Sequence, residues 1–364
     1  MQYAGKQRQQ GGCANLVQLA VRAVQQLAPA LLEPDERMAA ESALRSGARA
    51  VCLLPDAETE ESKLMLDSPW GQVGRPVLHD YKSPRSRYRV SIPLSAVRRW
   101  NGGVLTSNGY VLDERRLGEL VAVPEAERGD RSALRTRLQR DGYLFLTGLL
   151  DPAAVWAFRE YYFGLTGAAA DRASYRKVLF EEIVPGAEYA AFCAQPALKG
   201  WFEWFLGGEP FLHKRKIIRQ TAPGENGIGT ATQAHYDLVY LRGGSDQVLS
   251  AWIPLGDCPV SRGGLTYLEG SHHRVLEEEA AGRLKRPAAS ITADLPALAT
   301  QYDANWLVTD YAAGDVVVHT AHTVHAALDN VSTDMRLSTD IRYQRADDAV
   351  DARWQHHWHD QDGL

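Results

Sequence analysis

Short apolar runs, interrupted by glycine, proline and polar residues, dominate the C-terminal two-thirds of the chain. They recur at residues 216–221, 248–255, 265–268, 315–319 and 337–343. Runs of this length between turn residues are typical of β-strands, and many short strands favour a jelly-roll barrel over a wound parallel sheet. The pattern therefore predicts a mainly β fold with flanking helices and a double-stranded β-helix (jelly-roll) core.

Helical patterns lie before these runs. Apolar positions at helical spacing predict helices over residues 16–32 and 36–45, and another helix that starts at Arg131 and leads into the apolar run 143–146. Asp151-Pro152 predicts the start of a further helix, because aspartate caps a helix N-terminus and proline fits its first turn. We therefore expect helices to flank the strands, as in a jelly-roll domain with accessory elements.

Turn residues and the extent of the strand pattern divide the chain. Ser107-Asn108-Gly109 between two apolar stretches predicts a hairpin within residues 104–112, and a strand is expected at 89–94. We expect four segments: an accessory N-terminal extension (1–130), a jelly-roll domain (131–346), a lid-like insertion without matching strands inside that domain (274–314), and a C-terminal tail (347–364) that docks on the surface or frays.

Composition narrows the classes of partner. The chain has 364 residues, 45% of them hydrophobic, and a formal net charge of −5, so it can bury a large core but lacks the basic field on which nucleic-acid binding depends. The apolar stretch 16–32 is interrupted by polar residues and is too polar to span a bilayer. The four cysteines show no paired metal spacing, which favours reduced thiols. We expect a cytoplasmic protein with a small-molecule substrate and no nucleic-acid or membrane partner; its oligomeric state stays open.

The most informative chemical pattern is His235-Tyr236-Asp237, which closes a strand-like run. In an extended strand alternate side chains project to one side, so His235 and Asp237 can hold one ion. A further histidine, His325, lies far downstream, and Arg336 follows it by eleven residues. Two imidazoles and one carboxylate with the remaining positions open suit non-heme Fe(II), which must bind both an oxidant and a co-substrate.

These residues belong to a longer series of motifs in a fixed order. The series comprises Asp141-Gly142-Tyr143-Leu144-Phe145-Leu146-Thr147-Gly148, Ala234-His235-Tyr236-Asp237, Trp252-Ile253-Pro254-Leu255, the glycine-flanked stretch 263–272, Gly314-Asp315-Val316-Val317-Val318, and His325 through Asn330 to Arg336. In order and spacing it resembles the phytanoyl-CoA dioxygenase family of Fe(II)/2-oxoglutarate oxygenases. The resemblance covers residues 131–346 and is more specific than any one motif.

The resemblance implies a role for each matching residue. His235, Asp237 and His325 are expected to bind Fe(II), and Arg336 to bind the distal carboxylate of 2-oxoglutarate, with O2 as the oxidant. A planar, always-charged guanidinium suits a buried carboxylate because it can form two hydrogen bonds with it. Trp252 stands where the family often has an aromatic residue near the co-substrate, although a core tryptophan is an equal alternative.

Two further histidines, His319 and His322, lie close to His325 in the sequence. The family places its ligand directly before the segment that matches Ala326 to Asn330, which favours His325. We therefore expect His319 and His322 to line the pocket or to be structural.

Asp237 also bears on the reaction. Related halogenases have glycine or alanine at this position so that chloride can bind the metal, whereas Asp237 favours hydroxylation. Desaturation, epimerisation and cyclisation begin with the same hydrogen abstraction and stay open. So do two other classes, a jelly-roll binding protein without turnover and a zinc hydrolase with the same three ligands.

The sequence does not identify the substrate. Its selecting side chains would lie on loops, and the residues considered for the pocket are Lys214, Lys216, Arg219, Tyr240 and Trp306. No cluster of basic residues suggests a cradle for nucleotide phosphates, so we favour a free small molecule, such as a natural-product intermediate, over a CoA thioester.

Overall fold

The computed structural model describes residues 104–359 except 168, 226, 240–242 and 285–289, together with three short strands nearer the N-terminus. The chain divides into two compact units, residues 1–97 and 98–364. In the first unit, strands β1 (Leu53–Leu54), β2 (Val77–His79) and β3 (Tyr88–Ser91) form an antiparallel sheet in the order β1-β3-β2. The helices expected at 16–32 and 36–45 lie outside the described residues, whereas β3 corresponds to the strand expected at 89–94.

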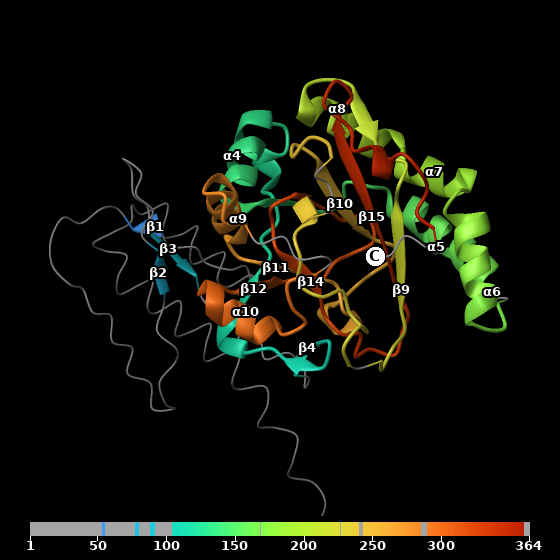
Figure 1. The fold of residues 1–364 in the computed structure, drawn as a ribbon, viewed down its shortest axis with the longest axis horizontal. Helices are drawn as coiled ribbons and strands as arrows, with labels where there is room; N and C mark the ends of the chain where they lie inside the picture. Colours follow the sequence, from blue (N-terminus) through green and yellow to red (C-terminus); the bar gives the residue numbers. More distant parts are fainter. Residues whose placement is uncertain are drawn as a thin grey trace, which may run out of the picture. The chain divides into compact units, whose positions relative to one another are not determined.

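Two β-sheets form the core of the second unit (Figure 1). The larger sheet has the strand order β7-β13-β10-β15-β8, with β9 paired to the first half of β15. The smaller sheet has the order β14-β11-β12-β6. All neighbours are antiparallel except β12 and β6, which are parallel. This arrangement is the expected jelly-roll core, mainly β with flanking helices.

The strands of the second unit are β4 (Thr106–Ser107), β5 (Tyr110–Val111), β6 (Leu117–Glu119), β7 (Tyr143–Leu146), β8 (Pro210–Leu212), β9 (Ile217–Thr221), β10 (Leu249–Pro254), β11 (Leu265–Leu268), β12 (Trp306–Val308), β13 (Val316–Thr320), β14 (His325–Ala327) and β15 (Arg336–Arg345). The helices are α4 (Arg131–Asp141), α5 (Pro152–Thr166), α6 (Arg172–Lys177), α7 (Ala187–Cys193), α8 (Pro196–Leu206), α9 (Ser271–Ala280) and α10 (Leu295–Tyr302). None of the helices in this described part of the chain has the length and apolar character needed to cross a membrane.

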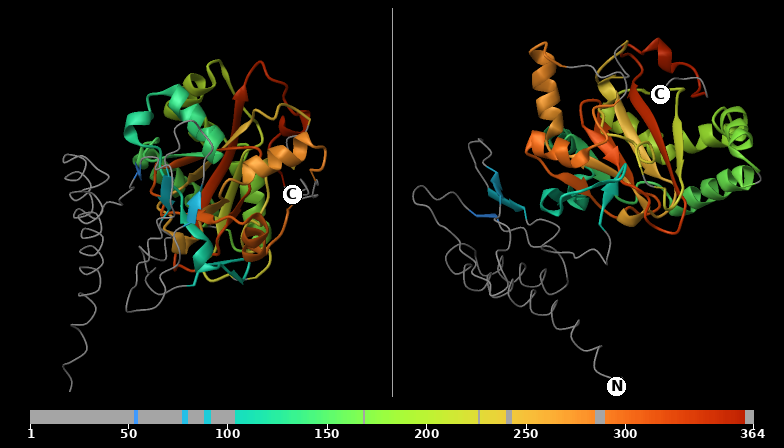
Figure 2. Two further views of the ribbon diagram at one scale, coloured as in Figure 1. Left: turned by 90° about the vertical axis from the view of Figure 1, so that its left-hand side faces the viewer. Right: turned by 60° about the horizontal axis from the view of Figure 1, so that its bottom comes forward.

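The helices cover the outer face of the larger sheet. Figures 1 and 2 show α5, α6 and α7 (green) on the side of this sheet that faces away from the smaller one. Phe158 of α5 and Tyr189 of α7 stack with a ring-centroid distance of 5.5 Å, and Phe202 of α8 stacks on Tyr343 of β15 at 4.3 Å. As expected, Asp151 caps α5, because its carboxylate accepts a hydrogen bond from the amide of Ala153. The helices thus bury the apolar face of the sheet and leave its other face for the site.

The domain boundary lies earlier than the sequence pattern indicates. The compact unit begins at Arg98, and β6 pairs with β12 although it precedes the expected boundary between residues 130 and 131. The hairpin expected at 104–112 is present as β4 and β5, and the amides of Asn108 and Gly109 in its turn donate to the buried carboxylate of Asp329. A strand of three residues such as β6 is too short to show a periodic pattern, which explains why the sequence missed it.

The segment 274–314 was expected to lack matching strands, and this expectation is wrong. It contains α10 and also β12, which pairs with β11 and β6 in the smaller sheet. Near its middle, Thr292 forms an isolated antiparallel bridge with Ala234, the residue before His235. The segment is therefore partly built into the jelly roll, and part of it lies directly beside the candidate site.

The C-terminal tail docks on the domain through Trp354. This side chain is buried, and the guanidinium groups of Arg215 and Arg342 lie 4.6 and 4.9 Å from its ring centroid. Of the two behaviours expected for the tail, docking is therefore the one observed for Trp354.

Candidate metal centre and co-substrate pocket

Two segments that are far apart in the sequence bring His235 and His325 together. Each residue donates its backbone amide to the carbonyl of the other, over 3.0 and 2.9 Å, and the two ring centroids are 4.2 Å apart. His325 is the first residue of β14, and His235 forms an isolated antiparallel bridge with it. Asp237 is the first residue of a 3-10 helix, Asp237–Val239. The expected reason for the proximity of His235 and Asp237, alternation along one regular strand, is thus incomplete, because the chain turns between them.

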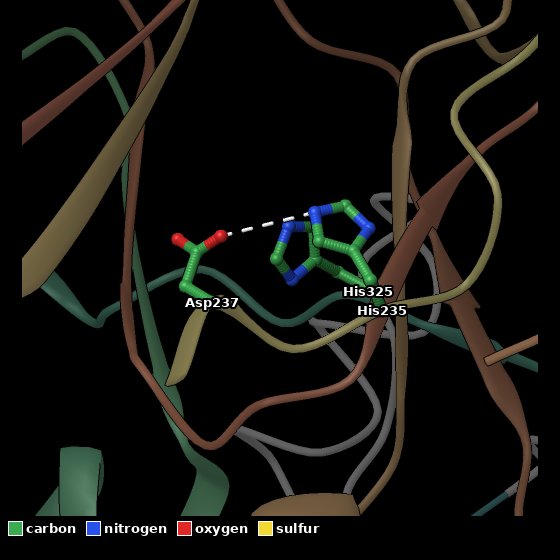
Figure 3. A group of neighbouring side chains, drawn as sticks. All are labelled: His235, Asp237 and His325. Carbon is green, nitrogen blue, oxygen red and sulfur yellow. Dashed lines mark ion pairs between the residues drawn. The ribbon is translucent and has the colours of Figure 1, made fainter. Parts of the chain in front are cut away.

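The three side chains point toward one another (Figure 3). Nε2 of His235 lies 3.8 Å from Oδ1 of Asp237, and one potential ligand atom from each of His235, Asp237 and His325 lies within 4.8 Å of the others. All three side chains are buried or nearly so. Two imidazole nitrogens and a carboxylate oxygen at such separations form a group that could hold one metal ion.

Backbone carbonyls fix the orientation of both imidazoles. Nδ1 of His235 donates to the carbonyl of Gln233 over 2.8 Å, and Nδ1 of His325 donates to the carbonyl of Thr323 over 3.0 Å. A carbonyl can only accept, so each Nδ1 carries the proton and each Nε2 keeps its lone pair for a metal. Burial lowers the pKa of both histidines, which keeps the rings neutral and able to coordinate.

Asp237 is held by two donors from the inner face of the larger sheet. The hydroxyl of Ser250 donates to Oδ2, and Nη2 of Arg342 donates to Oδ1 over 3.1 Å. Burial by itself would raise the pKa of Asp237, but the guanidinium of Arg342 holds it well below its usual range. Asp237 is therefore a carboxylate, and it retains capacity to bind a cation because each oxygen has more than one lone pair.

The two remaining histidines of the segment have different environments. Nε2 of His319 lies 3.6 Å from Oδ2 of Asp237, on the side of the carboxylate occupied by Ser250, and Nδ1 is 3.3 Å from the hydroxyl of Tyr267. His322 instead bonds to Glu279 of α9 over 2.9 Å. His319 thus lies at the candidate centre, whereas His322 is engaged by another element.

A small pocket, partly open to solvent, adjoins the histidines. It is lined by Arg219, Thr232, His235, Trp252, Leu265, His325, Arg336, Ser338 and Asp340. Of the residues considered for substrate selection, only Arg219 is in this lining; Tyr240 lies outside the described residues. Trp306 is instead a core residue of the smaller sheet, where its Nε1 donates to the carbonyl of Leu295.

Arg336 is buried in the wall of this pocket. Its Nε and Nη2 both donate to the hydroxyl of Thr221 on β9, over 3.2 and 2.6 Å, and among the described residues it has no carboxylate partner. Burial lowers the pKa of Arg336 to about 10, so the group remains charged at neutral pH. A buried guanidinium without an acidic partner is costly, and the carboxylate of a bound dicarboxylate would compensate it.

Trp252 lines the same pocket and is also part of a core. Its ring lies 4.8 Å from that of Tyr311, and only 3% of the residue is exposed. Trp252 was expected to lie either near the co-substrate or in the core. Its position on β10 places it both in the pocket wall and against the core.

Sequence reasoning missed Ser250, Ser338, Asp340 and Arg342. The last three lie on β15 together with Arg336, at alternate positions of the strand. Leu337, Ile341 and Tyr343 separate polar residues of β15 at a period of two, and this partial pattern was the available signal that one face of the strand is functional, although Thr339 interrupts it. Ser250 gave no such signal, since its role depends on contact with Asp237 across the fold.

Comparisons with known proteins agree with this geometry. The chain matches the family described as phytanoyl-CoA dioxygenase (PhyH) over residues 138–338. It is 29% identical over 235 residues to a 1-deoxypentalenic acid 11-beta-hydroxylase of Streptomyces arenae, covering 60% of this chain and 82% of that protein. The hydroxylase of the same name from Streptomyces exfoliatus is 30% identical over 234 residues, with the same coverage. Among solved structures, the epimerase SnoN in complex with Fe3+, alpha ketoglutarate and nogalamycin RO is 23% identical with a TM-score of 0.46, covering 61% of this chain and 86% of that one.

Proposed function

The chain belongs to the phytanoyl-CoA dioxygenase family of Fe(II)- and 2-oxoglutarate-dependent dioxygenases, and we propose that it hydroxylates an unactivated carbon of a small organic molecule, with His235, Asp237 and His325 as the iron ligands. The observation that carries the assignment is the convergence of these three side chains beside a buried arginine that has no acidic partner among the described residues. A protein that only bound metal would have no need of such an anchor for a dicarboxylate.

Each residue has a defined task in this proposal. His235 and His325 present their Nε2 atoms, and Asp237 supplies the one anionic ligand while Ser250 and Arg342 keep its carboxylate in place. Bound Fe(II), with 2-oxoglutarate and O2, supplies the oxidising chemistry that replaces a C–H hydrogen by hydroxyl and releases succinate and CO2.

Arg336 anchors the co-substrate. Its guanidinium binds the distal carboxylate of 2-oxoglutarate, and Thr221 keeps the guanidinium oriented toward the pocket. Trp252 and Leu265 provide an apolar wall that excludes water from the substrate side.

The relatives and the pocket support a proposal for the substrate class. The hydroxylases of the two Streptomyces species act, by their names, on 1-deoxypentalenic acid, a small organic acid. We infer that the present chain acts on a free natural-product intermediate, since among the described residues its pocket is lined by two arginines, one of which is assigned to 2-oxoglutarate.

Uncoupled turnover tests the ligand assignment without knowledge of the substrate. With Fe(II), 2-oxoglutarate and air, the native protein is expected to release succinate slowly, and His325→Ala to abolish that release. His322→Ala is the matched control and should retain it, because His322 bonds to Glu279 instead. Full activity of His325→Ala together with loss in His319→Ala would transfer the ligand role to His319.

Of the segment 274–314, which was expected to cover the iron, the part around Thr292 is proposed to act as a lid, on the basis of the bridge between Thr292 and Ala234 beside His235. Ser290 also donates to the side chain of Gln233 over 2.7 Å. Gln233→Ala removes this bond and is expected to raise succinate release relative to substrate hydroxylation. Unchanged coupling between the two would count against a lid.

A further inference from the structure

The pocket contains a carboxylate that neither the iron nor the co-substrate explains. Asp340 lies on β15 and lines the pocket with Arg336 and Ser338. Only 16% of its side chain is exposed. It is not one of the three proposed metal ligands, and an acidic group cannot serve as the anchor of a dicarboxylate.

The two oxygens of Asp340 have unequal surroundings. Oδ2 lies 3.9 Å from Nη2 of Arg342, which is too long for a hydrogen bond. Oδ1 is buried, and no described residue donates a hydrogen bond to it. Buried polar atoms are almost always paired, and leaving a charged acceptor unpaired costs free energy. A ligand that binds in the pocket and donates a hydrogen bond to Oδ1 would satisfy this unpaired acceptor.

The position of Asp340 suits a substrate contact. It is paired in register with Trp252 on β10, so the two side chains share the face of the sheet that lines the pocket. Along β15 it stands between Arg336, the proposed anchor of 2-oxoglutarate, and Arg342, which holds Asp237. A substrate bound at Asp340 would therefore lie next to both the co-substrate and the metal.

The surrounding charges indicate which donor fits. Burial raises the pKa of Asp340 above its ordinary value and Asp237 adds to this effect, whereas the guanidinium groups of Arg342 and Arg219 act to lower it. Two guanidinium groups therefore already lie near Asp340, and a further cation would be repelled by them. A neutral hydroxyl supplies the missing hydrogen without adding charge.

We propose that Asp340 is a specificity-determining residue that accepts a hydrogen bond from a hydroxyl group of the substrate through Oδ1 and so orients the carbon to be hydroxylated. The inference rests on the proposed function, because it places the substrate in the iron pocket. It assigns the enzyme a substrate that already carries a hydroxyl, and hence a place after an earlier reaction that installs or unmasks one.

The test uses three matched probes on the anaerobic complex of the protein with Fe(II) and 2-oxoglutarate. Cyclohexanol, cyclohexyl methyl ether and cyclohexylammonium share a ring but present a neutral donor, no donor and a charged donor. Their dissociation constants are measured from the change each causes in the visible charge-transfer absorbance of the complex. Native protein is expected to bind cyclohexanol about tenfold more tightly than the ether, as for one hydrogen bond to a charged acceptor.

Variants of Asp340 test whether this residue causes the preference for the alcohol over the ether. Asp340→Leu is expected to bind the alcohol and the ether equally, and Asp340→Asn, which keeps an acceptor oxygen, to retain part of the preference. Asp347→Asn is the matched control, since it removes an exposed aspartate beyond the end of β15, and it should behave as native. If Asp340→Leu does not fold, the graded loss in Asp340→Asn decides the same question.

Three results would overturn the proposal or its basis. An equal preference for the alcohol in native protein and in the Asp340 variants would show that Asp340 does not recognise the hydroxyl. Tighter binding of cyclohexylammonium than of cyclohexanol would replace the hydroxyl by a cationic group. Absence of the charge-transfer absorbance in native protein before any probe is added would refute the proposed function itself, which distinguishes that failure from failure at Asp340.

Discussion

The two faces of β15 differ in the kind of side chain that they carry. Leu337, Ile341 and Tyr343 point outward into the apolar core beneath the helices. On the other face, Arg336, Ser338 and Asp340 line the pocket, and Arg342 binds Asp237. The same strand thus contributes to the stability of the fold on one face and to the chemistry of the site on the other, because side chains of a strand alternate.

This difference means that the two contributions should be separable by substitution. Outer residues are expected to change the free energy of unfolding with little effect on metal or co-substrate binding. Inner residues are expected to change binding with a smaller effect on unfolding. The four predictions below test that separation, from the largest expected effect to the smallest.

Asp237→Ala should have the largest effect. It removes the only anionic ligand of the proposed centre, so succinate release is expected to fall at least about a thousandfold, or ~4 kcal/mol in activation free energy. Asp347→Asn, which changes the same charge at an exposed site, should keep native turnover. Substantial turnover in Asp237→Ala would exclude a metal centre built on this carboxylate.

Ile341→Ala tests the outer face. Ile341 is fully buried in the apolar core, and a large-to-small change there is expected to lower the free energy of unfolding by about 2–5 kcal/mol. Denaturant unfolding measures this loss, and the Fe(II) dissociation constant of the folded variant should stay native. If Ile341→Ala raised the Fe(II) dissociation constant and left the free energy of unfolding unchanged, the two faces of β15 would not be separable in this way.

Arg342→Met tests the inner face next to Ile341. Methionine keeps much of the volume but removes the donor to Oδ1 of Asp237, so the ligand carboxylate loses a partner that fixes its position. The Fe(II) dissociation constant is expected to rise by about 10–100-fold, as for the loss of other groups that orient a metal ligand. Native affinity would show that Ser250 alone suffices to hold Asp237.

The smallest effect is a pH dependence that arises outside both faces, at His272 of α9. Burial lowers the pKa of His272 to about 4. The unfolded chain binds a proton there near its ordinary value of about 6.5, whereas the folded protein does not, so stability is complete above that pH and is lost as pH falls toward 4.

Between pH 6.5 and 5.5 this group should cost roughly 1 kcal/mol of unfolding free energy. His272→Gln preserves a nitrogen that can donate to the carbonyl of Gln139 and cannot titrate, so its stability should fall less over that interval. The change in unfolding free energy between pH 6.5 and 5.5 should differ between His272→Gln and native protein by the same amount with and without Fe(II). A difference that disappears with Fe(II) would place the titrating group in the metal centre instead.

The sequence was sufficient for the architecture and for the residues that the structure brings together. Short strands in a fixed order indicated the jelly roll. The spacing of His235 and Asp237, together with the family resemblance that implied His325, indicated three side chains that do converge. Such patterns are local, or repeat along the chain, and can therefore be recognised without coordinates.

The contacts that support the site could not be predicted in this way. Ser250 and Arg342 reach Asp237 across the fold, and the bond between Asn108 and Asp329 joins residues that are 221 positions apart. The extent of the domain was missed for a similar reason, since β6 and β12 have three residues each and are defined by their pairing. Partial alternation along β15 was an unused signal, although Thr339 next to Asp340 interrupts it.

The most direct test of the account is an anaerobic titration of the protein with Fe(II) in the presence of 2-oxoglutarate, followed by visible absorbance. We predict that native protein develops the charge-transfer absorbance of the chelate with one Fe(II) per chain, that Asp237→Ala does not, and that Arg336→Gln requires a much higher concentration of 2-oxoglutarate. Absorbance of equal strength and equal 2-oxoglutarate dependence in all three proteins would contradict the assignment of the centre.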